Sequence, residues 1–293
     1  MSLARPLPEL GTLAPEDRGA LARAWRHLER PGFAARLTSV VGTPIEQGLE
    51  LLPADWSDRL HRRLEKVLVR ALETSIRSLG REESSHTSSQ GFHTAAGIGS
   101  GVVGGLLGLP GLLFDLPVST MIMLRSIAAI ARDEGEDLDS VEARLSCLTV
   151  FAYGARSHDD DAADTGYYGV RLALALALRN ASRHIAARGL ARESAPALVR
   201  LLAAISSRFG VTVTEKAAAM SVPLVGAAGG AAVNTLFIRH FQEVARAHFT
   251  VRRLERRYGR ELIRREYETI GSRSKPGARL LAEAAEADEQ KIA

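Results

Sequence analysis

The spacing of apolar residues along the chain predicts helices. Leu21, Trp25 and Leu28 recur at intervals of four and three, which places them on one face of a helix that begins at Pro15. A longer helix of about 25 residues is predicted from Asp55, because its apolar residues keep these intervals while its polar face is basic. Its apolar and basic positions are Leu60, Leu64, Val67, Leu68, Ala71, Leu72 and Ile76, and Arg59, Arg62, Arg63 and Lys66. The pattern is typical of an all-α protein.

Residues 94–114 are the most informative stretch, because 21 residues without a charge contain seven glycines. Five of these glycines repeat with spacings of 4, 3, 4 and 3, the period of one helix face: Gly97, Gly101, Gly104, Gly108 and Gly111. Each glycine inside a helix costs roughly 1 kcal/mol relative to alanine, so a tertiary contact must offset the loss. We expect this glycine stripe to face another helix closely or to face lipid.

A second uncharged stretch covers residues 217–238 and contains Gly226 and Gly230. We expect the two Gly/Ala-rich segments to pack against each other as the centre of a single multi-helix domain. The predicted organisation is an irregular arm at residues 1–15, the helical domain at 16–270 with a polar linker-like stretch at 81–90, and a mobile tail at 271–293.

Prolines and charges predict further helix boundaries. Pro110 and Pro117 flank Asp115, and proline lacks the amide proton that a helix interior needs, so we expect a break there. A new helix is expected at residues 118–133. The second uncharged segment is expected to run on into a long basic helix that ends near Tyr267.

Asp115 lies in apolar surroundings, which gives it three interpretations. It is expected to cap the helix that starts near Pro117. The alternatives are an ion pair with a buried arginine such as Arg125, and a catalytic role.

The two uncharged segments raise the question of membrane contact. Twenty-one helical residues cover roughly 31 Å, about the thickness of the hydrocarbon layer. Glycine, proline and Asp115 argue against a span, because each raises the cost of insertion. A membrane span, a reversible contact at the membrane interface and a buried soluble core all stay open, and so does a lipid-binding pocket between the segments.

Positive charge is concentrated near the C-terminal end of the chain. The whole sequence has a net charge of +4, whereas residues 251–265 alone hold seven arginines and two glutamates, a net of +5. Arg252, Arg253, Arg256 and Arg257 lie on an amphipathic helix and are candidate contacts for anionic lipid, with a solvated face as the alternative. Aromatic residues make up only 5% of the chain, so no nucleic-acid partner is expected.

The acidic cluster at residues 158–164 is the candidate site for metal chemistry. The candidate metal ligands are His158, Asp159 and Asp164, and the candidate catalytic residues are Asp160 and Asp161 together with Asp115. Carboxylate and imidazole groups suit hard and borderline cations. However, DxDxDG spacing is absent and acidic residues are expected at a helix start, so capping is the favoured interpretation. No cofactor is expected.

Motifs exclude or weaken several other functions. Cys147 is the only cysteine, so the chain cannot form an internal disulfide. Residues 99–104 fit GxGxxG, but the segment before them is a poor strand, which argues against a dinucleotide site. The N-terminal segment lacks the apolar region of a signal peptide, so a cytoplasmic protein is expected, either free or at the inner face of the cell membrane.

Three stretches resemble the bacterial EcsC family. They are LERPGFAARLTSVVGTPIEQGLELLP at residues 28–53, the glycine segment with FDLPVSTMIMLRSIAAIARDEGEDL at 114–138, and VPLVGAAGGAAVNTLFIRHFQEVARAHFTVRRLERRYG at 222–259. The resemblance covers residues from about 21 to about 267. The family is named for a protein encoded beside the two components of an ABC transporter, and it has no agreed catalytic residues to carry over.

The resemblance implies a non-enzymatic, membrane-associated accessory or interaction protein, linked to an ABC transport system. Some family members carry a peptidase label, so the alternative is a metal-dependent hydrolase that uses the cluster at residues 158–164. The chain contains no HExxH or GxSxG motif to support that alternative. The expected partner is a membrane surface or a membrane protein, and the sequence does not indicate the oligomeric state.

Overall fold

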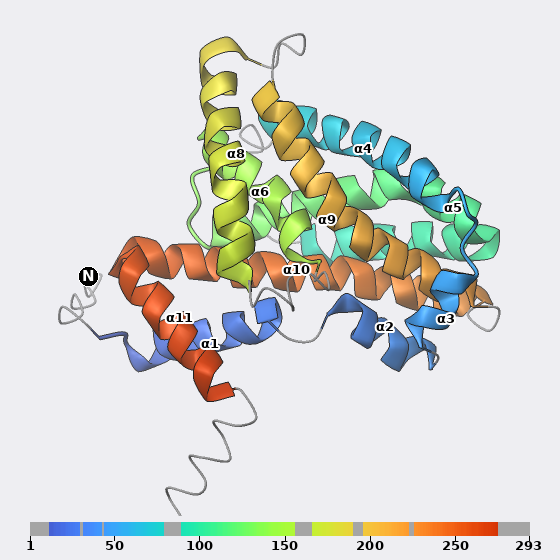
Figure 1. The fold of residues 1–293 in the computed structure, drawn as a ribbon, viewed down its shortest axis with the longest axis horizontal. Helices are drawn as coiled ribbons and strands as arrows, with labels where there is room; N and C mark the ends of the chain where they lie inside the picture. The colour runs from blue at the N-terminus through green and yellow to red at the C-terminus, as the bar shows by residue number, and fades with distance from the viewer. Residues whose placement is uncertain are drawn as a thin grey trace, which may run out of the picture.

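The computed structural model describes residues 12–29, 32–42, 44–78, 89–155, 166–189, 196–222 and 226–274 (Figure 1). Within these ranges the regular elements are α-helices and there is no strand. The helices are α1 (Pro15–Glu29), α2 (Phe33–Val41), α3 (Ile45–Glu50), α4 (Trp56–Ser78), α5 (Ser89–Asp133), α6 (Val141–Tyr153), α8 (Tyr167–Arg188), α9 (Pro196–Ser221), α10 (Gly226–Tyr258) and α11 (Arg260–Ser274). The expected all-α fold is confirmed.

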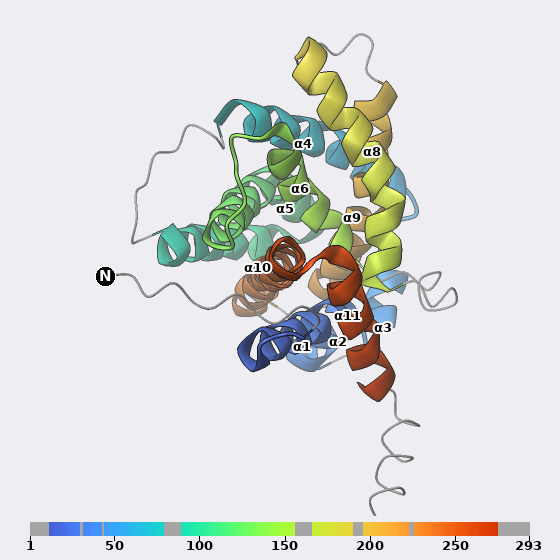
Figure 2. The same ribbon diagram turned by 90° about the vertical axis from the view of Figure 1, so that its left-hand side faces the viewer.

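Helix α10 crosses the middle of the molecule, with α1 and α2 on one side and α5, α6 and α9 on the other (Figures 1 and 2). Its most extensive contact is with α5. The side-chain amide of Gln242 donates to Ser126 at 2.9 Å, and the hydroxyl of Thr250 donates to Glu134 at 3.0 Å. Because partners follow the same order along both segments, α5 and α10 run parallel.

Phenylalanine side chains form the centre of the core. Phe33 of α2, Phe151 of α6, Phe209 of α9, and Phe237 and Phe241 of α10 are all buried. Neighbouring rings have centroids 4.8–6.2 Å apart, mostly in tilted or edge-to-face arrangements, which aromatic quadrupoles favour. Four helices that are distant in sequence are thereby fixed around one point.

The two amphipathic faces predicted near the N-terminus are confirmed. Leu21, Trp25 and Leu28 of α1 are buried together. In α4, Leu60 and Leu64 are buried, as are the other apolar positions up to Leu72, while Ile76 is partly buried against the core. The basic residues of α4 therefore lie toward the outside.

The predicted break between Pro110 and Pro117 is wrong, because α5 continues through both prolines for 45 residues. Pro117 has no amide proton, so it cannot donate the usual helical hydrogen bond to the carbonyl of Leu113. Arg63 of α4 takes its place, with its Nε 2.9 Å from the Leu113 oxygen. A side chain from a neighbouring helix thus satisfies the carbonyl that the proline leaves free.

Two other predicted boundaries are also wrong. The uncharged segment at residues 217–238 is not one helix, since α9 ends at Ser221 and α10 begins at Gly226. The long basic helix does not continue to Tyr267, because α10 ends at Tyr258 and Gly259 adopts a left-handed φ of +89°. Glycine adopts that conformation without steric strain, so it separates α10 from α11.

The glycine stripe lies in α5, where residues 94–114 are helical as expected. Gly111 and Gly230 are buried. The surroundings of the remaining candidate glycines lie outside the described part of the structure: Gly97, Gly101, Gly104, Gly108 and Gly226. Close packing of the whole stripe therefore stays a prediction.

The predicted arm, linker and tail fall largely outside the described residues, at residues 1–11, 79–88 and 275–293. Helix α11 continues to Ser274, so residues 271–274 belong to this helix and not to the predicted tail.

Candidate functional site

Asp115 lies in the middle of α5 and caps no helix, so the capping prediction is wrong. Its partner is Lys216 of α9, whose Nζ is 3.6 Å from Oδ2, and not Arg125, which is exposed. Lys216 also donates to Oδ1 of Asn234 at 2.6 Å and lies 4.4 Å from the centroid of the Phe237 ring. One buried ammonium group thus joins α5, α9 and α10.

This buried pair is suited to holding helices together. Lys216 is 1% exposed, and its partners Asp115 and Asn234 are also buried. A substrate in solvent therefore has no direct access to these three side chains. Burial lowers the pKa of Lys216 to about 8, although the carboxylate of Asp115 acts in the opposite direction. Removing one partner of such a buried ion pair strongly destabilises the folded protein, because the other charge stays buried without compensation.

The candidate lipid-binding arginines of α10 are engaged within the chain. Arg252 binds Glu136 through two hydrogen bonds of 2.8 Å, and Arg256 binds the same carboxylate. The residues that Arg253 and Arg257 bind are also acidic: Glu134 and Asp17 for Arg253, and Asp17 for Arg257. These contacts attach α10 to α1 and to the connection between α5 and α6.

Electrostatics at Glu136 follow from this arrangement. Burial alone would raise the pKa of Glu136, but its hydrogen bonds and charge interactions with Arg252 and Arg256 outweigh that effect and lower the pKa. Ion pairs with acidic residues of the same chain therefore neutralise much of the charge of the α10 arginines. Their predicted contact with anionic lipid stays a prediction.

A second basic region lies between α4 and α5, where two successive hollows of about 480 and 460 Å³ separate the helices. Among the described residues that line them, six are basic and none is acidic. We name this region the α4–α5 surface, and its charged members are Arg59, Arg62, Arg63, Lys66, Arg70 and Arg125.

Most of these cations have no partner within the described part of the chain. Arg59 pairs with Asp55 one turn earlier, and Arg63 donates to the Leu113 carbonyl. The other four basic side chains make no hydrogen bond or ion pair with any residue that the structure describes: Arg62, Lys66, Arg70 and Arg125. Their charge is available to a ligand or surface outside the molecule.

Apolar side chains of α5 stand beside these cations. Phe114 is 74% exposed and Val118, one turn later, is 52% exposed. An exposed phenylalanine on a surface with unpaired cations is the composition of an interfacial membrane contact. The spacing 114, 118 follows from the helical period of α5, which buries Leu112 and Leu116 and turns these two residues outward.

The start of α4 is fixed on α9. The indole of Trp56 donates to the hydroxyl of Thr214 at 3.2 Å, and Trp56 is buried. The bonds of Trp56 to α9 and of Arg63 to α5 fix the orientation of α4, so its basic side chains line the α4–α5 surface.

Among the described residues, two helical stretches have the length and hydropathy of a membrane span, Leu109–Asp133 and Pro196–Ser221. In the most apolar 18-residue window of each, 56% of the first and 39% of the second is buried within the molecule. Core helices of soluble proteins have the same properties, so this observation carries little weight by itself.

The acidic cluster at residues 158–164 lies outside the described residues, so its metal and catalytic roles stay predictions. Within the described ranges, no three histidine, cysteine, aspartate or glutamate side chains come together as a metal site. Tyr167 and Arg171, which follow this cluster, have partners on α10. Tyr167 lies 2.8 Å from Nδ1 of His248, and Arg171 binds Glu255 at 2.6 and 2.7 Å.

Comparison with known proteins agrees with this architecture. Residues 20–254 match the model of the EcsC protein family, which is most of the chain. The chain belongs to the EcsC family. No curated protein and no solved structure shows a significant match to it.

The EcsC match includes the whole of α4 and most of α10, and it ends within α10 at residue 254. It therefore covers the α4–α5 surface and the pair of Glu136 with Arg252, whereas Arg256 lies just beyond it. The expectation of EcsC membership is confirmed, while the family description assigns no activity.

Sequence reasoning identified the basic face of α4 in this EcsC protein but did not propose it as a site. The signal was present, because Arg62, Lys66 and Arg70 recur every four residues along one face of the helix. What the sequence does not contain is the position of Phe114 beside them. That position depends on the packing of α5 against α4.

Proposed function

We propose that this protein is a non-enzymatic accessory protein that binds the inner face of the cell membrane through the α4–α5 surface. The observation that carries the proposal is the exposure of Phe114 next to Arg62 and Lys66, two cations that have no partner among the residues the structure describes. A membrane with anionic lipids offers an apolar layer for the phenylalanine and negatively charged headgroups for the cations.

The energetics favour reversible binding. Each lysine or arginine near an anionic membrane surface contributes about 1 kcal/mol, and an inserted aromatic side chain adds its buried apolar area. The α4–α5 surface has four such unpaired cations among its described residues. Together these groups support an attachment that salt weakens.

A surface contact fits better than a membrane span. If α5 crossed the bilayer alone, Asp115 and Lys216 would separate and the contact with α10 would be lost. A buried charge without its partner is strongly unfavourable. The peripheral attachment keeps these contacts and uses only side chains that already face outward.

Vesicle co-sedimentation tests the proposal. We expect the protein to sediment with vesicles of phosphatidylcholine and phosphatidylglycerol but to remain soluble with phosphatidylcholine alone. The variant Arg62→Gln/Lys66→Gln should bind the anionic vesicles about tenfold or more weakly, since two contributions of about 1 kcal/mol are removed.

A matched control removes two exposed arginines at the same spacing elsewhere, Arg179→Gln/Arg183→Gln on α8. Phe114→Ser is compared in the same way with Leu172→Ser, since Leu172 of α8 is 75% exposed. Equal losses for the α4–α5 and α8 variants would contradict this choice of surface. Full recovery of the wild-type protein in the soluble fraction at low salt would contradict membrane attachment itself.

The resemblance to the EcsC family adds the proposal that the accessory role concerns an ABC transport system. It is tested by deleting the gene and measuring the transport phenotype. Restoration by the wild type and by Arg179→Gln/Arg183→Gln, but not by Arg62→Gln/Lys66→Gln, would support the role. Full activity in the deletion strain would contradict it.

A further inference from the structure

A larger groove lies on the other side of α4, bordered by α2, α3 and α9, with a volume of about 1060 Å³. Its lining from α4 includes Leu60 and Leu64, whereas the basic residues of α4 face the α4–α5 surface. Several of its lining residues are small, among them Ala34, Ala35 and Gly210.

The electrostatic character of this groove is opposite to that of the α4–α5 surface. Glu46 of α3 and Glu215 of α9 line it together with the imidazole of His61 of α4, and no lysine or arginine is among the described residues that do. Neither carboxylate makes a hydrogen bond or ion pair with a residue in the described part of the chain. Glu215 is partly buried, and burial raises its pKa to about 7.

Two of the five hydroxyl groups among the described lining residues present acceptor oxygens to the groove. Thr38 donates its proton to the carbonyl of Ala34 at 3.1 Å, and Ser207 donates to that of Ala204 at 3.2 Å. Since each hydroxyl proton is used within its own helix, the free lone pairs of these oxygens remain. Carboxylates and acceptor oxygens together complement a group that has only N–H donors.

The end of the groove beside Glu215 is rigid. A Cβ atom at Gly48 of α3 would lie 2.2 Å from the carbonyl oxygen of Ala218, so the backbones of α3 and α9 touch there. Ala218 lies three residues after Glu215, on a neighbouring position of the same helix face. The carboxylate is therefore held beside a fixed helix crossing.

We propose that this groove is a binding site for a small organic amine, with its ammonium group on the carboxylate of Glu215 and its apolar part against Leu60 and Leu64. An ammonium group supplies a positive charge and N–H donors to these carboxylates and acceptor oxygens. The apolar residues suit an alkyl chain. This inference goes beyond the proposed membrane attachment and does not depend on it.

The test uses n-hexylamine as the probe and isothermal titration calorimetry at pH 6 and pH 8. Hexylamine is charged throughout this range, so a change of affinity reports on the protein. Glu215 and His61 are both titratable lining residues, and the variant Glu215→Gln distinguishes between them. A carboxyl group with a pKa of about 7 is mostly protonated at pH 6 and mostly ionised at pH 8. We expect binding to be about tenfold tighter at pH 8.

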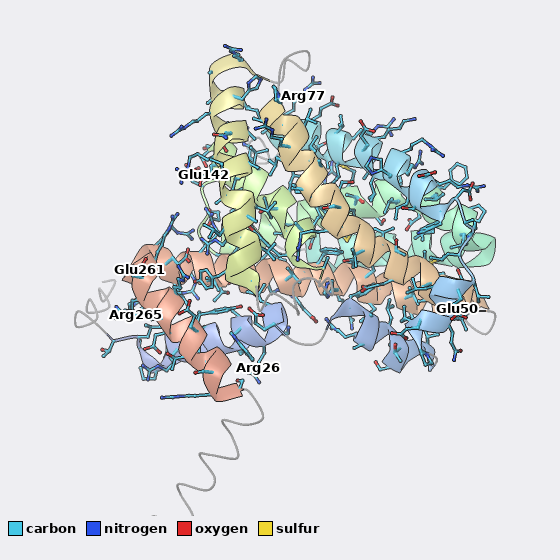
Figure 3. The ribbon with its side chains drawn as sticks, in the orientation of Figure 1. Arg26, Glu50, Arg77, Glu142, Glu261 and Arg265 are labelled. Carbon is cyan, nitrogen blue, oxygen red and sulfur yellow. The ribbon has the colours of Figure 1, made fainter. Side chains whose placement is uncertain are left out.

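Glu215→Gln should weaken hexylamine binding at pH 8 at least tenfold and remove the pH dependence. Glu142→Gln is the matched control, since this exposed glutamate lies on α6, well away from α3, where Glu50 is labelled (Figure 3). It should bind like the wild type. 1-Hexanol, which has the alkyl chain without the charge, should bind weakly and equally at both pH values.

Equal binding of hexylamine by the wild type and Glu215→Gln would overturn the proposal, and so would affinity that does not change between pH 6 and pH 8. Thermal melting shows whether each variant is folded. Glu215→Gln removes an unpaired, partly buried charge and is expected to fold, so a loss of binding reports on the site.

Discussion

Helices α4 and α10 are both rich in arginine, but they use this residue in opposite ways. In α10, Arg252 and its neighbours bind acidic residues of α1 and of the α5–α6 connection. In α4, Arg62 and Arg70 have no partner among the described residues. The α10 arginines therefore stabilise the fold, whereas those of α4 leave charge available outside it.

Local charge density alone therefore does not identify a binding surface. The sequence places its densest positive charge at residues 251–265, yet the acids that neutralise it are Asp17, Glu134 and Glu136, more than a hundred positions away. The decisive quantity is the number of cations that have no acidic partner after the chain has folded. Among the described residues, Arg62, Lys66 and Arg70 of α4 have none, whereas each of the four candidate arginines of α10 is paired.

The largest expected effect that separates the two helices is on stability. Arg252→Met removes both hydrogen bonds to Glu136, whose side chain is 4% exposed, and should lower the free energy of unfolding by about 2 to 3 kcal/mol. Urea denaturation at pH 7 measures it. A loss no larger than that of an exposed arginine would contradict the structural role of α10.

The same pair predicts how stability depends on pH. Because the pKa of Glu136 is lowered from 4.5, its contribution is present above pH 4.5 and is lost as the pH falls through the lowered pKa of the folded state. Stability of the wild type should therefore decrease more steeply in acid than that of Arg252→Met. Parallel curves from denaturation at pH 3 to 6 would be evidence against this pairing.

Glu215 lies beside α4 and is an acid with no partner among the described residues. Its pKa is raised to about 7, so it destabilises the folded state as the pH rises from 4.5 through 7. Glu215→Gln should increase the free energy of unfolding at pH 8 by about 1 to 2 kcal/mol and change it little at pH 4. Denaturation at the two pH values measures this, and equal effects would count against an unpaired carboxylate.

Salt should affect the two helices differently. Raising NaCl from 0.1 to 0.5 M shortens the range of interactions between exposed charges, so binding to anionic vesicles should fall about tenfold. The stability difference between Arg252→Met and the wild type should change by less than about 0.5 kcal/mol, because that pair is largely buried. Salt-insensitive vesicle binding would exclude α4 as an electrostatic contact.

The smallest expected effect is that of Arg62→Met on stability. Arg62 is exposed and has no partner among the described residues, so the free energy of unfolding should change by less than about 0.5 kcal/mol. Urea denaturation beside Arg252→Met provides the contrast. A comparable loss in both variants would remove the distinction between α4 and α10.

Local periodicity was sufficient to predict the helical class and the buried faces of α1 and α4. Boundaries were predicted less well, because they depend on distant groups. The sequence shows Pro117 but not the guanidinium of Arg63, fifty positions earlier, that compensates the missing amide proton. Gly259 is the converse case, where a single residue ends α10 and its signal was overlooked.

The candidate sites show the same limit. Asp115 was correctly recognised as unusual, but its partner Lys216 is a hundred positions away, and no spacing rule connects them. The charge on α4 was visible in the sequence, while the exposure of Phe114 beside it required the packing of two helices. Contacts at long sequence separation therefore decide both the boundaries of α5 and the chemistry around it.

The bond from Arg63 to the Leu113 carbonyl has an evolutionary consequence. A residue other than proline at position 117 would restore the amide donor to the Leu113 carbonyl. The hydrogen bond from the guanidinium at position 63 would then no longer be needed to satisfy that carbonyl. The two positions should therefore covary among relatives, with arginine retained at 63 where proline occupies 117. Once both are present, either substitution alone leaves a carbonyl or a cation to find a new partner, so the pair is expected to be exchanged together.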